Sequence, residues 1–198
     1  MPSLVVDGTA VPILHESQLA SLLGIEPDAA ADASRTAGDT VTLLGGWCSL
    51  IEPLDWNLLT APTRSRGRAL RNLTVNVFHP FELLPVAWRE GVFDWDPDRD
   101  EEREAALTDP AGLHAYASAI TERWAAFVLD TAEEIRGNDR QVEGPRGEIG
   151  FSHLLEQQRW HAAFHYRQVV DFLGSHGLSP ASIDLAGFAG LELPDELY

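Results

Sequence analysis

Two histidines within one helical segment carry the strongest chemical signal in the sequence. The segment FSHLLEQQRWHAAFHYRQVVDFL places His161 and His165 four residues apart. Four residues turn an α-helix to within about 40° of a full rotation, so both rings lie on one face and can share one metal ion. The alternative is a pair of core or partly exposed histidines that their neighbours satisfy, and the spacing alone leaves both interpretations open.

The residues around this pair favour a functional site. The helical face that contains the pair has apolar side chains at both ends, but its middle consists of Gln158, His161, His165 and Gln168. Burying a polar group without a partner costs about 1–3 kcal/mol. Four such groups in succession need a reason, and we expect Gln158 and Gln168 to lie next to the site or at its rim.

A catalytic metal site needs a third protein ligand and an open coordination position. His79, on a different predicted helix, is the candidate, although its helical phase differs from that of the apolar stripe through Leu73 and Val77. His153 is the rival. It lies two turns from His161 and about 80° around the helix, so we expect it at the rim.

Arginines and a cysteine offer further chemistry. Four arginines cluster at the start of the second predicted helix, and of these Arg68 and Arg71 are candidates to bind an anionic group of a substrate. The alternative is that the cluster neutralises nearby acids. Cys48 is the single cysteine and has no neighbouring base, so we expect a buried, inert thiol.

The segments that position these residues have helical patterns. Prolines at 80 and 85 fall inside the second helix, so we expect it to be kinked or broken near His79. Four helices without long strand patterns predict a mainly α protein, a four-helix bundle. The expected helices span residues 40–54, 65–88, 110–136 and 148–174. The expected loops span residues 55–64, 94–104 and 137–147.

The ends of the chain have different patterns. Two short apolar runs around Asp7-Gly8 predict a β-hairpin, and a short helix over 16–23 would complete a ββα appendage. The expected domains are therefore the appendage at 1–25, a linker at 26–39, the bundle at 40–177 and an irregular tail at 178–198.

Composition excludes several classes of function. The 198 residues have a net charge of −17, and all 14 basic residues are arginine. So acidic a chain repels phosphate backbones, which argues against nucleic-acid binding, and without lysine there is no Schiff-base chemistry. No apolar run approaches the roughly 18 residues of a membrane helix. The N-terminus lacks a basic signal-peptide region, so we expect a cytoplasmic protein.

The motif RWHAAFHYRQVVDFL resembles the last helix of the DinB-like superfamily, in which a His-x-x-x-His run is followed by Gln. His79 in NVFHPFELL matches the histidine of that superfamily's second helix, although Pro80 departs from the pattern. The resemblance covers residues 40–175. It implies an up-down-down-up four-helix bundle with a divalent metal (zinc, nickel or iron) on His79, His161 and His165.

The resemblance also implies a class of function. The bundle is similar to mycothiol- and bacillithiol-dependent transferases and to mycothiol-dependent maleylpyruvate isomerase, so we expect thiol transfer or isomerisation on a small molecule, with a homodimer as one option. A non-catalytic metal- or ligand-binding stress-response or accessory bundle is the alternative. The N-terminal unit resembles the end of a glutaredoxin-like domain, but without a CxxC motif it is at most a remnant.

Overall fold

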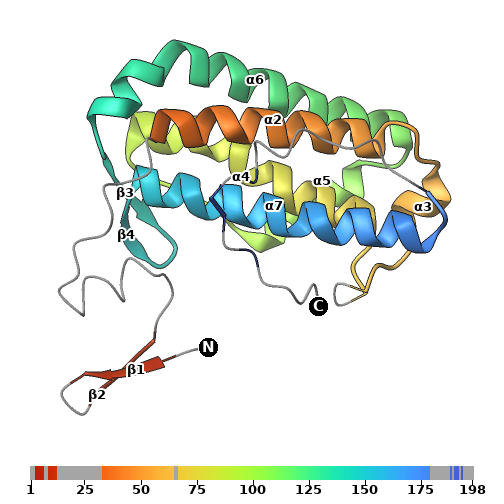
Figure 1. The fold of residues 1–198 in the computed structure, drawn as a ribbon, viewed down its shortest axis with the longest axis horizontal. Coiled ribbons are helices and arrows are strands. Elements are labelled where there is room, and N and C mark those ends of the chain that lie inside the picture. Colours follow the sequence, from red (N-terminus) through yellow and green to blue (C-terminus); the bar gives the residue numbers. More distant parts are fainter. Residues whose placement is uncertain are drawn as a thin grey trace. The chain divides into compact units, whose positions relative to one another are not determined.

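The computed structural model describes residues 3–6, 9–12, 33–64, 67–178 and four positions near the C-terminus (188, 190, 191 and 193) (Figure 1). The chain divides into two compact units, 1–32 and 33–198. In the first unit, β1 (Ser3–Val6) pairs antiparallel with β2 (Thr9–Pro12), as the Asp-Gly pair predicts. The expected helix over 16–23 and most of the expected tail lie outside the described residues.

The second unit is mainly α, and four long helices form a bundle, which confirms the predicted fold class. The long helices are α2 (Ala33–Ile51), α4 (Leu70–Glu90), α6 (Pro110–Gly137) and α7 (Phe151–Ser175). The shorter elements are α3 (Trp56–Thr60), α5 (Pro97–Ala106), β3 (Gln141–Gly144) and β4 (Gly147–Gly150).

The bundle has up-down-down-up topology. Figure 1 shows α4 and α6 running in one direction and α2 and α7 in the other. Contacts between side chains agree: Arg159 of α7 pairs with Asp39 near the start of α2, and Tyr166 packs on Trp47 further along both helices. Of the two parallel pairs, only α4 and α6 follow one another in the chain and need a crossover connection, and α5 runs back along α4 within it.

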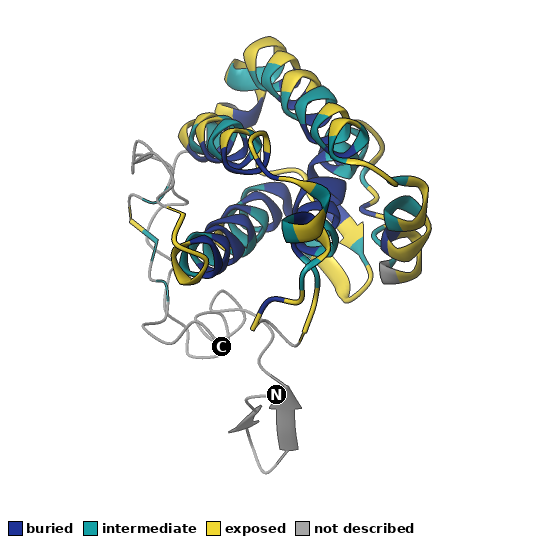
Figure 2. Cartoon of the chain, turned by 90° about the vertical axis from the view of Figure 1, so that its right-hand side faces the viewer, coloured by how far each residue is buried: buried dark blue, intermediate teal, exposed yellow. Residues whose placement is uncertain are grey.

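Large aromatic side chains fill the centre of the bundle, where the helices turn their buried faces toward one another (Figure 2). Two buried indole nitrogens find acceptors within it. Trp47 Nε1 donates to Thr74 Oγ1 at 3.2 Å, and Trp124 Nε1 donates to Thr40 Oγ1 at 2.7 Å. Burial of each large apolar side chain stabilises the fold by about 1.5–3 kcal/mol, so this core fixes the relative heights of the four helices.

Helix α4 is continuous through both prolines, so of the kink or break expected near His79, the break is wrong. A proline removes one backbone donor and crowds the preceding turn, which weakens an isolated helix. Here α4 packs against α5, α6 and α7, and Phe78, Phe81 and Leu84 are buried. Packing of this kind outweighs the lost hydrogen bonds.

Four predicted segments also differ, and the first is the expected loop at 55–64, which contains the short helix α3. Helix α2 begins at Ala33, so residues 33–39 of the expected linker are helical, with Thr36 and Ala37 buried. The expected acidic loop contains α5, which begins with Asp96 as its N-cap and a proline in its first turn. The expected loop before the last helix forms the β3–β4 hairpin.

The hairpin is joined to the end of α4 through backbone hydrogen bonds between Glu143 and residues Gly91 and Phe93. No helix within the described part of the chain is long and apolar enough to cross a membrane.

Candidate metal centre

The histidine pair on α7 has the predicted geometry. The ring centroids of His161 and His165 are 4.6 Å apart, with the planes at 84°. His165 is buried, and its Nδ1 lies 2.7 Å from Oε1 of Gln168. Because an amide oxygen can only accept, Nδ1 carries the hydrogen and Nε2 of His165 retains its lone pair. Gln168 therefore contacts the pair, as its place on the helix suggests.

Electrostatics keep both imidazoles neutral. Burial, then the neighbouring His165 and the charge of Arg68, lower the pKa of His161 to about 3. Burial also lowers the pKa of His165, and Arg68 acts in the same direction, against the hydrogen bond that His165 donates to Gln168. Metal ions bind the neutral form of histidine, so the pair is ready for ligation at neutral pH without losing protons.

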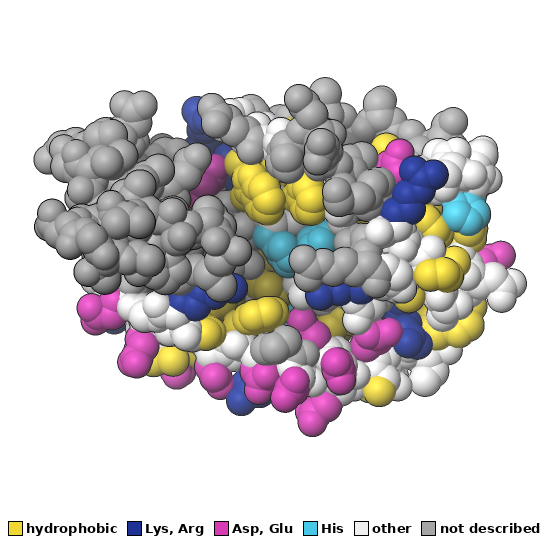
Figure 3. All heavy atoms as spheres, turned by 90° about the horizontal axis from the view of Figure 1, so that it is seen from below, with side chains coloured by type: hydrophobic (Ala, Val, Ile, Leu, Met, Phe, Trp, Pro, Cys, Tyr) yellow, Lys and Arg dark blue, Asp and Glu magenta, His cyan; other side chains and the backbone are white. Residues whose placement is uncertain are grey.

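One face of the molecule exposes histidine side chains. His161 is only partly buried. Figure 3 shows histidine side chains in the middle of one face of the molecule, between hydrophobic groups and close to arginines. A small molecule can therefore approach histidines from this face.

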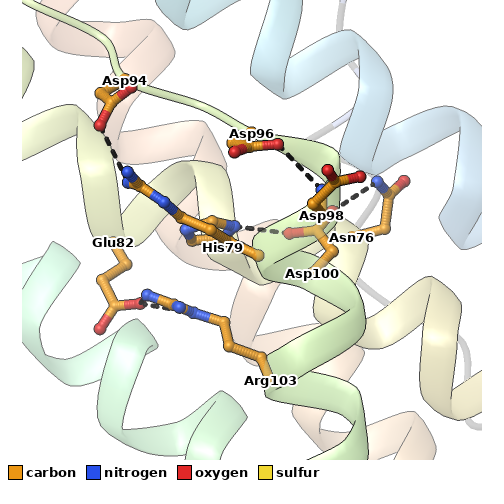
Figure 4. A network of polar contacts seen from close by, with 9 residues as sticks. Asn76, His79, Glu82, Asp94, Asp96, Asp98, Asp100 and Arg103 are labelled. Carbon is orange, nitrogen blue, oxygen red and sulfur yellow. Dashed lines mark hydrogen bonds and ion pairs between the residues drawn. The ribbon is translucent and has the colours of Figure 1, made fainter.

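His79 on α4 is fully buried, and its environment is polar on one side only. Its Nδ1 lies 2.5 Å from Oδ1 of Asp100, and Oδ2 of Asp100 accepts a hydrogen bond of 3.1 Å from Asn76 (Figure 4). The other ring nitrogen, Nε2, is buried and has no hydrogen-bond partner in the structure. An unpaired buried nitrogen costs about 1–3 kcal/mol, so a ligand is expected at this atom.

His79 of α4 and the histidine pair of α7 lie at a similar level of the bundle, as the contacts of their neighbours in sequence indicate. The ring centroid of Trp47 on α2 lies 6.3 Å from that of Phe78 and 6.1 Å from that of Tyr166. Phe78 precedes His79 in the sequence, and Tyr166 follows His165. Nevertheless, no group of three or more His, Cys, Asp or Glu among the described residues is arranged to hold a metal ion. The donor types and the unpaired Nε2 suit zinc, nickel or iron, whereas the described side chains are not gathered into a ligand set.

The other candidate residues have different surroundings. Arg71 donates to Glu104 through Nε and Nη2, at 3.1 and 2.7 Å, and stacks over Trp56. Its guanidinium is thus already engaged. Arg68 is exposed, and its charge reaches both histidines of α7.

His153 and Gln158 are half-buried on α7. The Sγ atom of Cys48 lies 3.5 Å from Oγ1 of Thr121, and burial raises the pKa of the Cys48 thiol, which suits the expected inert group.

Asp100 and Asn76 are the residues of this centre that the sequence reasoning missed. Asp96-Pro97 is a helix-start signal, and it would have placed Asp100 on a helix instead of in a solvated loop. Asp100 and Glu104 are four residues apart, so they share the face of α5 that meets α4.

A groove of about 570 Å³ lies between α4 and α6, lined from Phe81 and Glu82 to Asp130 and Glu134. Its lining contains none of the three histidines.

Comparison with known proteins supports the fold. The structure resembles that of YfiT from Bacillus subtilis, which is described as a probable metal-dependent hydrolase with an unusual four-helix bundle topology. The TM-score is 0.62 at 16% sequence identity, over 78% of this chain and 94% of that chain. The likeness agrees with the predicted four-helix bundle. At this level of identity the likeness concerns the fold alone.

Sequence comparisons give less. No protein-family model matches the chain. A stretch of 70 residues is 34% identical to arginine vasopressin-induced protein 1 of Rattus norvegicus, which amounts to 35% of this chain. The chain spans about half, 46%, of the length of that curated relative.

Proposed function

We propose that this protein binds a divalent metal ion, zinc, nickel or iron, through His79, His161 and His165 and uses it in a reaction on a small molecule. The observation that carries the proposal is the buried, unpaired Nε2 of His79 at the level of two neutral histidines. Together the three residues supply nitrogen donors from two helices, and three protein ligands leave positions open for substrate.

The side chains around the histidines prepare them for this role. A bound divalent metal supplies Lewis acidity, which lowers the pKa of water or a thiol and polarises a carbonyl group. Asp100 and Gln168 each engage the Nδ1 of one histidine. Arg68 provides an exposed positive charge near the pair, where it can attract an anionic substrate to an otherwise acidic protein. No side chain is required as a covalent nucleophile.

The reaction we propose is thiol transfer or thiol-dependent isomerisation, with a low-molecular-weight thiol as partner, in the cytoplasm. The DinB-like resemblance of the His-x-x-x-His helix supports this reaction class. Metal-dependent hydrolysis is a second candidate, because the structurally similar YfiT is described as a probable metal-dependent hydrolase. Non-catalytic metal or ligand binding is the third candidate, and binding of a ligand other than a metal would need no assembled set of metal ligands among the described residues.

Metal analysis of protein purified without added metal tests the site. We expect stoichiometric metal in the wild type and its loss in His79→Ala, His161→Ala and His165→Ala, with helix content retained by circular dichroism. His114→Ala, a partly buried histidine on α6, is the matched control and should keep its metal. Full occupancy in all three ligand variants would exclude the site, and loss in His153→Ala but not in His79→Ala would replace His79 by His153.

Activity assays separate the three functions. Loaded protein is assayed with electrophiles together with mycothiol, bacillithiol, glutathione or cysteine, and separately with ester and amide substrates in the absence of thiol. Metal-dependent consumption of a thiol supports transfer or isomerisation, and thiol-independent cleavage supports hydrolysis. A fully loaded protein that turns over nothing supports the binding function.

A further inference from the structure

Helix α5 docks on α4 through polar contacts and not through an apolar face. Its sequence, PDRDEEREAA, has no large apolar residue, and Asp100 is the one buried side chain among those described in it. A helix normally docks through an apolar stripe. Burial of a carboxylate costs several kcal/mol unless it is paired, so such an arrangement is weak as a source of stability and points instead to a specific role for the carboxylate.

The contacts of α5 hold Asp100 against His79 from both sides. Glu104 accepts from Arg71 and Asn72, which precede His79 on α4. Arg103 donates at 2.8 Å to Glu82, which follows His79 on the same helix. At the level of His79, Asn76 donates to the second oxygen of Asp100. Both oxygens of the Asp100 carboxylate therefore have a hydrogen-bond partner, and the partner of Oδ1 is Nδ1 of His79 (Figure 4).

From this geometry we infer that Asp100, held by Asn76, is a positioning residue. It fixes the imidazole of His79 in the tautomer with hydrogen on Nδ1, so that Nε2 presents a bare lone pair. A carboxylate can only accept, whereas a neutral imidazole can place its hydrogen on either nitrogen. Without an acceptor at Nδ1, the hydrogen can move to Nε2 and block that atom as a ligand. The use of this tautomer in metal binding rests on the proposed function. The tautomer itself is a property of the metal-free protein.

Nitrogen NMR of metal-free, histidine-labelled protein at neutral pH tests the tautomer directly. The signals of His79 are assigned by their loss in His79→Gln. We expect hydrogen on Nδ1 and none on Nε2 in the wild type. Asp100→Asn should preserve this state, because the amide oxygen still accepts. Asp100→Ala should place hydrogen on Nε2 in part or in full. Asp98→Ala, an exposed residue of the same helix, is the matched control and should match the wild type.

Zinc affinity, measured by competition with a chromophoric chelator, provides the second readout. Loss of a partner behind a histidine ligand typically weakens metal binding about 10–100-fold, so we expect this loss in Asp100→Ala. Asp100→Asn should stay within a few-fold of the wild type. If Asp100→Ala does not fold, Asn76→Ala takes its place, with mixed tautomers and weaker zinc binding expected.

Three outcomes would overturn the inference: hydrogen on both nitrogens of His79 in the wild type, a bare Nε2 in Asp100→Ala, or equal loss of zinc affinity in Asp100→Asn and Asp100→Ala. A wild-type protein with the expected tautomer that binds no zinc would instead contradict the proposed function and leave the assignment of Asp100 intact.

Discussion

Two of the three candidate ligands are oriented in the same way by different chemistry. Nδ1 of His79 faces the carboxylate of Asp100, and Nδ1 of His165 faces the amide oxygen of Gln168. A carboxylate accepts a stronger hydrogen bond than an amide oxygen, so the ring of His79 is held more rigidly than that of His165. His161, nearest to solvent of the three, is kept neutral by burial and by neighbouring charge.

Cys48 is predicted to be dispensable and slow to react. Burial raises the pKa of its thiol, which reduces the thiolate fraction at any given pH, and the thiolate is the reactive form. Alkylation by iodoacetamide should therefore be slower than that of a free cysteine at neutral pH and should rise only at more alkaline pH. Cys48→Ser should retain metal content and any activity. Rapid alkylation at neutral pH, or loss of activity in Cys48→Ser, would assign the thiol a role in the site.

At the scale of the elements, a buried ion pair joins the two parallel helices α2 and α7. Arg159 is almost fully buried and pairs with Asp39 of α2 at 3.1 Å and with Glu156 of its own helix at 3.2 Å. Arg159 lies two residues before His161, so this contact helps to fix the position of α7 relative to α2 close to the histidine pair.

Asp39→Ala should destabilise the protein. Removal of one partner of a buried pair costs about 3–5 kcal/mol, and we expect about 1–3 kcal/mol here because Asp39 is partly exposed and Glu156 remains. Urea unfolding measures the change. Glu133→Ala removes the exposed pair with Arg136 on α6, and this control should change the free energy of unfolding by less than about 0.5 kcal/mol. Equal effects of the two variants would contradict a structural role for the Arg159 pair.

The sequence predicts those elements that have a periodic apolar pattern and recognisable capping residues. Asp109-Pro110 at the start and Gly137 at the end gave the bounds of α6 almost to the residue. Helix α5 was missed because it docks through polar contacts and has no apolar stripe to detect. Pro80 suggested a break in α4, but the penalty it imposes is local, whereas the packing that offsets it comes from three other helices.

The same division applies to the candidate site. The His161–His165 pair is visible in sequence, because both ligands lie on one helix with a fixed spacing. The burial of His79 and its contact with Asp100 depend on how α4 packs against α5. The periodicity of either segment does not show which other segment it packs against. In the sequence, His79 is a candidate only as a histidine on a different predicted helix, a choice that the resemblance to a known pattern supports.

At the scale of the whole molecule, charge is the dominant feature. With 31 acidic and 14 basic residues, the chain has a net charge of −17 at neutral pH. Several arginines are bound to carboxylates, among them Arg71, Arg99 and Arg103. The remaining excess of negative charge repels itself in the folded state and repels anionic ligands at long range.

Salt should therefore stabilise this protein. The screening length falls from about 30 Å at 0.01 M to about 8 Å at 0.15 M ionic strength, which weakens repulsion across the folded molecule more than it weakens short, partly buried ion pairs. We expect the midpoint of thermal unfolding of metal-free protein to rise between these two concentrations of sodium chloride. Sodium fluoride at the same ionic strengths separates screening from specific binding of chloride, because screening depends on ionic strength alone. A midpoint that is unchanged or falls would mean that the surface ion pairs contribute more to stability than the net repulsion takes away.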